Sequence, residues 1–242
     1  MLRSPIVKRL ATVLAGVGVL LALAPSASAR VVELGAGVPA AKSNCPANPC
    51  EVIGQVTGYQ GRSESVKDPF MVTSDGVVVA FTIELAKLEQ NQIEFFTNLY
   101  GSSSQVRLSI LRRGKRKKTR LDHRLISESR AYQISRYFGS SPTFVLPEPM
   151  RVRKGEIVAL TIPTWAPAFA RDLTNANWWR SSRRKGRCDD VNQRAQFGAE
   201  GTVRVFGCTY RTARLLYTAT FVPNNEPTDG SGRDQNQNQR RR

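Results

Sequence analysis

Hydrophobic and polar residues alternate with a period of two over several short stretches of the chain, as in β-strands with one buried face. The final stretch of the body, "TYRTARLLYTATFV", shows this most clearly. One face of it carries Ala213, Leu215, Tyr217, Ala219 and Phe221, while mostly threonines and arginines occupy the other. This pattern predicts a strand of an antiparallel sheet that covers a core on one side.

Two further stretches predict hairpins. In "PFMVTSDGVVVAFTIELA" the favoured turn pair Asp75-Gly76 lies between two β-rich runs. After this turn the residues that share a face are Val77, Val79, Phe81, Ile83 and Leu85. In "SQVRLSILRRGKRKKTRLDHRLI" a turn is expected near Gly114, so its basic run forms the tip and return strand of a hairpin.

Residues 143–163, "TFVLPEPMRVRKGEIVALTIP", predict a strand, a Pro-Glu-Pro corner, a short strand, a turn at Lys154-Gly155 and a further strand. One helix is expected, in "LEQNQIEFFTNLYG", with Gly101 at its end. The positions of Ile93, Phe95 and Asn98 in that stretch also permit irregular structure. Many short strands with one short helix predict an all-β sandwich or barrel.

From Pro163 to about Gly201 no convincing strand is visible. The prolines at the start of this segment stiffen it and remove hydrogen-bond donors that a central strand needs. Because it contains all three tryptophans and ends near a cysteine, we expect an ordered loop packed over one end of the body.

The stretch "MRVRKGEIVALTIP" resembles the closing strands of secreted bacterial jelly-roll sandwiches, among them carbohydrate-binding and lectin-like modules. More closely, "RKGEIVALTIPTWAPAFA" together with "YRTARLLYTATFVP" resembles uncharacterised secreted bacterial proteins over most of residues 45–222. The resemblance implies a single antiparallel β-sandwich of jelly-roll type, and it carries over no ligand or catalytic residue.

The two ends of the chain differ from the body. Residues 1–29 combine early positive charges, a 15-residue apolar run and an Ala-Ser-Ala cleavage site, which predicts a signal peptide and a secreted, extracellular protein. No later segment is apolar enough to span a membrane. We expect residues 30–44 to be flexible, residues 45–222 to form the sandwich, and residues 223–242 to be a disordered polar tail.

An oxidising compartment favours disulfides between the four cysteines. Three connectivities are open, and we expect the local pairs Cys45–Cys50 and Cys188–Cys208. Their spacing does not fit a zinc site, and the sole histidine, His123, lies in a basic run. We therefore expect no metal and no cofactor.

The formal net charge is +17, and residues 45–222 carry 27 basic and 15 acidic residues. Two runs hold most of the excess. The basic hairpin contributes Arg112, Arg113, Lys115, Arg116, Lys117, Lys118 and Arg120. The second run, after the paired tryptophans, contributes Arg180, Arg183, Arg184, Lys185 and Arg187. Charge focused in this way suits an anionic partner, although a solvated hairpin tip gives the same pattern.

For Trp165 we expect a buried plug at the end of the sandwich. Of Trp178 and Trp179, neighbours in an extended segment, one is expected to be buried and the other exposed. The exposed ring, with the arginines that follow it, would bind a sugar and its acidic groups. The second run and its two tryptophans therefore form the candidate binding site.

These features predict a secreted, non-catalytic binding module for an anionic glycan or cell-envelope polymer. One alternative is a polysaccharide lyase or other carbohydrate-active enzyme, with His123 or a tyrosine as base; the other interpretation of His123 is an exposed hairpin residue. A second alternative is a structural envelope protein without a specific ligand. Nucleic acid is an unlikely partner because the chain is exported.

Overall fold

The computed structural model describes residues 30–37, 39–101 and 103–224. The expected signal peptide, and the expected tail beyond Asn224, lie outside these residues. No helix in the described ranges is long and apolar enough to cross a membrane.

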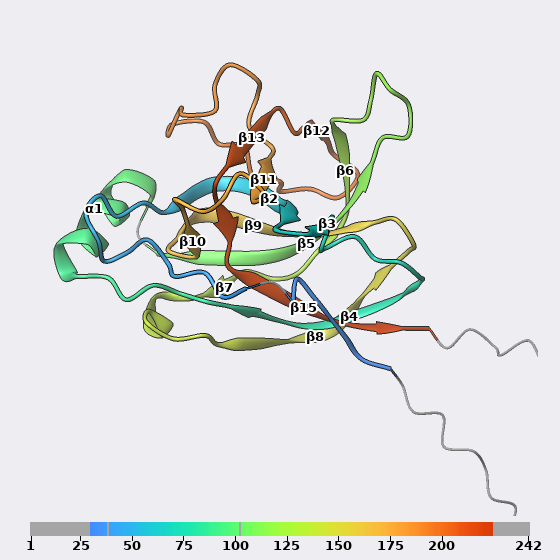
Figure 1. Ribbon diagram of the computed structural model, residues 1–242, viewed down its shortest axis with the longest axis horizontal. Helices are drawn as coiled ribbons and strands as arrows, with labels where there is room; N and C mark the ends of the chain where they lie inside the picture. The colour runs from blue at the N-terminus through green and yellow to red at the C-terminus, as the bar shows by residue number, and fades with distance from the viewer. Residues whose placement is uncertain (1–29, 38, 102, 225–242) are drawn as a thin grey trace, which may run out of the picture.

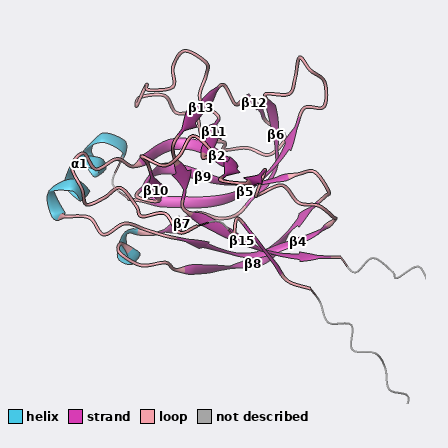
Figure 2. Ribbon diagram, viewed as in Figure 1, coloured by secondary structure: helices cyan, strands magenta, loops and turns pink. Residues whose placement is uncertain are grey.

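Eight strands form two antiparallel sheets that pack face to face (Figures 1 and 2). The first sheet has the order β1 (Val32–Leu34), β15 (Tyr217–Pro223), β4 (Gly76–Ile83) and β8 (Thr143–Val152). The second has at its centre β2 (Ile53–Ser63), β9 (Ile157–Ala166), β5 (Gln105–Arg113) and β6 (Asp122–Glu128). Taken in chain order, the strands are the first, eighth, third and sixth in one sheet and the second, seventh, fourth and fifth in the other. This is the jelly-roll arrangement, so the predicted fold class is confirmed.

The core lies between these sheets because each strand turns its apolar positions inward. Leu108 and Val158 of the second sheet and Phe81 and Phe221 of the first belong to one buried cluster. All five residues of the alternating face predicted from Ala213 to Phe221 are buried. They do not form one strand, however, because β14 (Arg214–Leu215) pairs with β10 (Phe169–Ala170), apart from β15.

Short strands extend the second sheet at both edges. On one side lie β11 (Trp178–Ser181) and β13 (Cys208–Arg211), and on the other lies β12 (Val203–Val205). Two small additions are β3 (Val66–Lys67), paired with β2, and β7 (Tyr132–Gln133), paired with β5. Only Phe206 and Gly207 separate β12 from β13, so one stretch of chain joins the two edges. The second sheet therefore curls into a half-barrel.

The expected hairpin at Asp75-Gly76 is wrong. β4 pairs with β15 and β8, and the run before the turn makes only a bridge from Met71 to Ile157 of the other sheet. That run is the crossover between the sheets, with Phe70 and Val72 buried along it. Tertiary burial has overridden the local turn preference.

Irregular pairing also changes two predicted strands. In β4 the register shifts between Val78 and Ala80, so Val78 is buried instead of the expected Val77 and Val79. The same irregularity lies opposite the Pro-Glu-Pro stretch, which is not a corner but part of the continuous edge strand β8. Prolines are tolerated there because an edge strand has unpaired backbone groups.

The segment from Pro163 to Gly201 is ordered as expected but is not strand-free. β9 continues through Pro163 to Ala166, and β10 and β11 follow. Pro163 lies where β9 passes an irregularity in β2, between the pairs that Ile162 and Trp165 form. A proline fits such a site because no regular ladder bond is lost there.

The predicted helix is confirmed as α1 (Gln90–Tyr100), and a 3₁₀ turn, η1 (Ser135–Tyr137), lies further along the chain. Trp165 is buried against Phe96 of α1 and against Phe138, in a small second core at the helix end of the molecule. The expected burial of this side chain is confirmed. The Trp165 ring therefore packs α1 against β9 of the second sheet.

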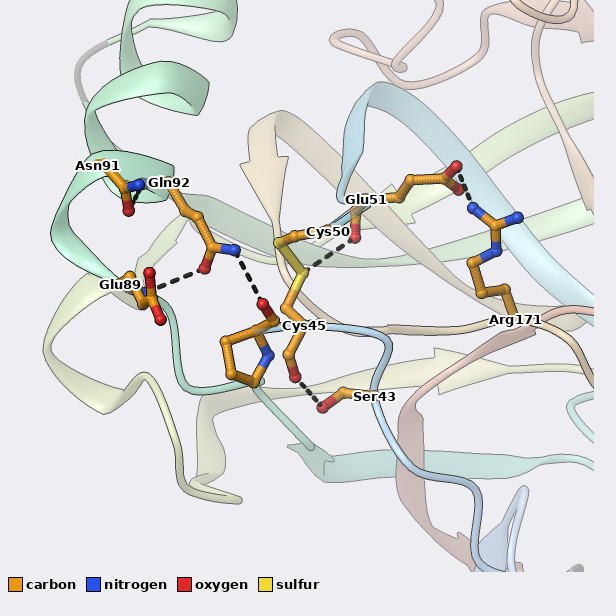
Figure 3. Close-up of a disulfide and its surroundings, with 9 residues drawn as sticks. Ser43, Cys45, Cys50, Glu51, Glu89, Asn91, Gln92 and Arg171 are labelled. Carbon is orange, nitrogen blue, oxygen red and sulfur yellow. Dashed lines mark hydrogen bonds and ion pairs between the residues drawn. A yellow bond between two sulfur atoms is a disulfide. The ribbon is translucent and has the colours of Figure 1, made fainter. Parts of the chain in front are cut away.

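The Cys45–Cys50 disulfide packs in the same small core and is confirmed (Figure 3). The Gln92 side chain of α1 donates to the Pro46 carbonyl at 3.1 Å and accepts from the Glu89 backbone N–H. The disulfide loop is thus tied to the first turn of the helix.

The first sheet includes Val32–Leu34, within the N-terminal segment that we expected to be flexible and outside the sandwich. This strand pairs with β15, and its Leu34 side chain is buried. The Glu33 carboxylate accepts hydrogen bonds from Thr218 and Thr220 of β15. Three residues are too few for their alternation to stand out in the sequence.

Candidate functional site: a basic groove on the curled sheet

β11 carries Trp178 and Trp179 between β2 and β13. Trp179 faces the core, where it is buried and stacks on Tyr210 with ring centroids 4.3 Å apart. Trp178 is half-buried and lies against Gly61 of β2, where no side chain intervenes. The two rings therefore take opposite faces of the sheet, and only Trp178 is available on the outer face.

Trp178 lines a groove of about 1190 Å³, here called the main groove. Its walls come from four parts of the chain: the β5–β6 hairpin, the β8–β9 turn, β11, and the segment from Lys185 to Thr209. Tyr59 of β2 lies among its lining residues. The groove is larger than a typical pocket for one small molecule, which is roughly 300–1,000 Å³.

The main groove is strongly basic. The hairpin contributes Arg112, Arg113, Lys115 and Arg120. The other segments contribute Arg153, Lys154, Arg180 and Lys185. Both predicted basic runs thus face one space, together with a third basic segment at the β8–β9 turn.

Glu156 is the one acidic side chain among the lining residues, and its charge is compensated. It is buried, and its Oε1 accepts from Arg112 at 2.6 Å while its Oε2 accepts from the Arg153 backbone N–H at 2.9 Å. These contacts fix the hairpin against the β8–β9 turn. The groove keeps a large net positive charge.

The guanidinium of Arg180 lies 5.7 Å from the centre of the Trp178 ring, a cation–π distance. A planar cation thus lies over one face of the aromatic ring. A ring face suits the C–H face of a sugar, and guanidinium groups bind carboxylate, sulfate or phosphate oxygens in pairs. The groove thus holds both an aromatic ring and guanidinium groups.

Beneath the groove, the Tyr59 hydroxyl lies 3.0 Å from Nε2 of His123. Nδ1 of the same ring lies 2.9 Å from the Leu121 carbonyl, which can only accept, so Nδ1 carries the proton and Nε2 accepts from Tyr59. His123 is fully buried and packs on Phe206. The interpretation of His123 as an exposed hairpin residue is therefore wrong, because its side chain points inward from β6.

The surroundings of this pair set its protonation. Burial lowers the pKa of His123 from 6.5 to about 4, with smaller contributions in the same direction from Arg113 and Arg180, while the Leu121 hydrogen bond opposes the shift. Burial also raises the pKa of the Tyr59 hydroxyl, against the effect of the arginines. At neutral pH both groups are uncharged.

The other predicted binding residues separate into three groups. Arg183 is buried, and its guanidinium donates to the backbone carbonyls of Cys188 and Gly54. Arg184 and Arg187 are exposed and line a second, smaller groove. The hairpin residues Arg116, Lys117 and Lys118 are exposed and line neither groove.

The Cys188–Cys208 disulfide is also confirmed and lies close to the second basic run. The backbone of this run is held further by the Gly207 N–H, which donates to the Arg183 carbonyl at 2.9 Å. A side chain at Gly207 would meet the Lys185 backbone nitrogen at 2.4 Å, so only glycine allows this approach. The loop that carries Lys185 therefore has a fixed place beside the main groove.

Sequence reasoning missed Tyr59, Arg153 and Lys154. The turn at Lys154-Gly155 was predicted, and the structure places Gly155 at a φ of 83°, but nothing local showed that this turn faces the hairpin. The β8–β9 turn lies near the β5–β6 hairpin because β9 is next to β5 in the sheet, and no local sequence pattern reveals that order.

Comparison of the chain with known protein families, curated proteins and solved structures gives no match. Within the described residues, no three histidine, cysteine, aspartate or glutamate side chains come together as metal ligands.

Proposed function

We propose that the protein is an extracellular, non-catalytic binding module for an anionic glycan, such as a carboxylated or sulfated polysaccharide or a cell-envelope polymer. The observation that carries the proposal is the main groove, which is lined by eight basic side chains from separate segments together with the half-buried Trp178. The two disulfides are typical of a protein that folds in an oxidising compartment.

The composition of the main groove favours a glycan over a small acidic molecule as the ligand. Its volume of about 1190 Å³ exceeds that of a typical small-molecule pocket, and its basic residues come from four separate segments of the chain. Aromatic and cationic side chains together suit a repeating unit that has both an apolar ring face and a negative charge.

The test is retention of the protein on immobilised heparin and on a polyuronate over a salt series. Lys115→Gln with Arg120→Gln removes two charges from the groove wall, and we expect elution at clearly lower salt, with a shallower salt dependence, because fewer counterions are released. The matched control, Lys117→Gln with Lys118→Gln, removes two charges from the same hairpin outside the groove. Equal losses in both variants, or no retention of the wild-type protein, would refute the proposal.

Glycan cleavage by β-elimination remains a second candidate because one observation favours it: Tyr59 is among the residues that line the basic groove, and its hydroxyl is hydrogen-bonded to a neutral imidazole. His123 is fully buried and Tyr59 is 3% exposed, and of the two only Tyr59 is among the lining residues of the groove. Incubation with polyuronates, followed by the absorbance of unsaturated products, tests this candidate. Activity that disappears in Tyr59→Phe would support it, and absence of product would leave the binding function.

A further inference from the structure

A second groove of about 640 Å³ shares Lys185 with the main groove. It is lined by Arg184, Arg187, Arg194 and Arg204, with Lys185, and by no acidic side chain. All of these basic residues except Lys185 lie outside the main groove, and Arg194 and Arg204 belong to neither of the two predicted basic runs. The second groove is thus a separate concentration of positive charge.

Most of this charge has no partner in the part of the chain that the structure describes. The side chains of Arg184, Lys185, Arg194 and Arg204 form no ion pair there, whereas Arg187 pairs with Asp190. Nε of Arg204 is buried without a hydrogen-bond partner. Clustered like charges destabilise a folded protein by self-repulsion, so an external anion would stabilise this groove.

Arg204 is also held in place. Its guanidinium lies 5.8 Å from the centre of the buried Phe197 ring, and its strand β12 pairs with β6 in register with His123. A cation that is already positioned loses less side-chain entropy when it binds an oxyanion. The groove therefore has at least one preorganised anion contact.

Lys185 lines both grooves. Its loop is fixed by the Cys188–Cys208 disulfide and by the close approach of Gly207, as described above. The two basic surfaces are thus contiguous across one exposed lysine, and their separation does not depend on a flexible segment.

The grooves differ in one respect that bears on the ligand. The main groove has the Trp178 ring, while the second groove has no aromatic side chain among its lining residues. The first can contact a sugar ring and its charge, and the second can contact only charge and polar groups. A neutral glycan could form only hydrogen bonds there, so the second groove favours a charged ligand.

We propose that the two grooves are successive subsites for one anionic glycan chain, which lies along Trp178 and the hairpin, crosses Lys185 and continues over Arg194 and Arg204. This proposal rests on the proposed function and deepens it, because it assigns a long, regularly charged polymer instead of a short acidic sugar.

The test is binding of heparin-derived oligosaccharides of graded length to the full protein, measured by titration calorimetry. Short oligosaccharides should fill the grooves separately, with two bound per protein. Once an oligosaccharide is long enough to cross Lys185, the stoichiometry should fall to one, and the affinity should rise by at least tenfold, because the second contact becomes intramolecular.

Arg184→Gln with Arg194→Gln changes two exposed side chains of the second groove and should remove the gain with length, while short oligosaccharides still bind the main groove. Lys117→Gln with Lys118→Gln should leave both results unchanged. If long oligosaccharides bind two per protein, or if the groove variant keeps the gain, the subsites are independent and this inference fails while the proposed function stands. If no oligosaccharide binds at all, the proposed function fails with it.

Discussion

The Trp178 ring lies directly on Gly61, so close that a β-carbon at position 61 would be 1.9 Å from the ring. Gly61 lies where the pairing of β2 with β11 shifts register, between the partners of Trp178 and Trp179. The bulge and the missing side chain together let an indole lie close against the sheet at the wall of the main groove.

Gly61→Ala should therefore displace Trp178 without unfolding the protein, because the half-buried ring can swing outward. We expect a change in unfolding free energy below about 1 kcal/mol. Affinity for an acidic glycan should fall as far as it does in Trp178→Ala. Glycan titrations of both variants, with acrylamide quenching of tryptophan fluorescence, check this; unchanged affinity in Gly61→Ala would show that the ring position does not matter.

Gly58→Ala is the matched change beneath the other tryptophan. A β-carbon there would be 2.7 Å from the buried Trp179 ring and 3.3 Å from the Arg180 carbonyl, and neither neighbour can move into solvent. Overpacking should cost about 1–3 kcal/mol of stability. Urea unfolding measures it, and a variant as stable as Gly61→Ala would contradict the assignment of the two rings to opposite faces.

Trp165 should matter for stability alone. Trp165→Ala removes the ring that packs against Phe96 and Phe138, and we expect a loss of about 3–5 kcal/mol. Trp165→Phe should cost clearly less, because it keeps a ring and removes an indole N–H that is buried without a partner. Thermal unfolding compares the two, and glycan affinity, measured where each variant is folded, should equal that of the wild type.

His123 should make the fold sensitive to acid. Its folded pKa, about 4, lies below the ordinary value of 6.5, so the unfolded chain binds a proton first as the pH falls. The contribution of the neutral His123 to the free energy of unfolding is fully present above about pH 6.5 and is lost toward pH 4. We expect the free energy of unfolding to decrease by roughly 2 kcal/mol between about pH 7 and about pH 4.5 for this reason.

Urea unfolding over this pH range measures the decrease. Carboxyl groups titrate in the same range, so the relevant quantity is the difference from His123→Gln, which keeps an acceptor for Tyr59 but cannot take up the proton. Parallel pH profiles for the two proteins would exclude the buried, neutral imidazole.

Much of the fold could be predicted because the signals were local. Alternation from Ala213 to Phe221 marked the buried face of the final strands, and helical spacing marked α1. The predicted hairpin at Asp75-Gly76 does not form, because the local turn preference stabilises less than the burial of Phe70 and Val72 in the crossover between the sheets. Strand β11 was missed since it has four residues and gains its stability from two neighbours far away in sequence.

The site was predictable in composition and not in geometry. The two basic runs and the tryptophan pair were visible, but curling of the sheet decides which of their members meet. Arg183 lies in the same run as Arg180, yet it is buried on backbone carbonyls, and Lys117 lies in the same hairpin as Lys115, yet it lines neither groove. A run of basic residues has no alternation of polar and apolar positions that would reveal which side chains point toward a groove.

The outer strands of the curled sheet are short, which limits strand-to-strand association in a protein that accumulates along a polymer. Binding to one chain of a polyanion raises the local concentration of protein, and exposed sheet edges are then the surfaces most prone to strand-to-strand association. Here the edge strands β12 and β13 have three and four residues and are joined to each other through Phe206 and Gly207. The same stretch of chain that borders both grooves therefore leaves the curled sheet little edge length beside the grooves on which neighbouring copies could aggregate.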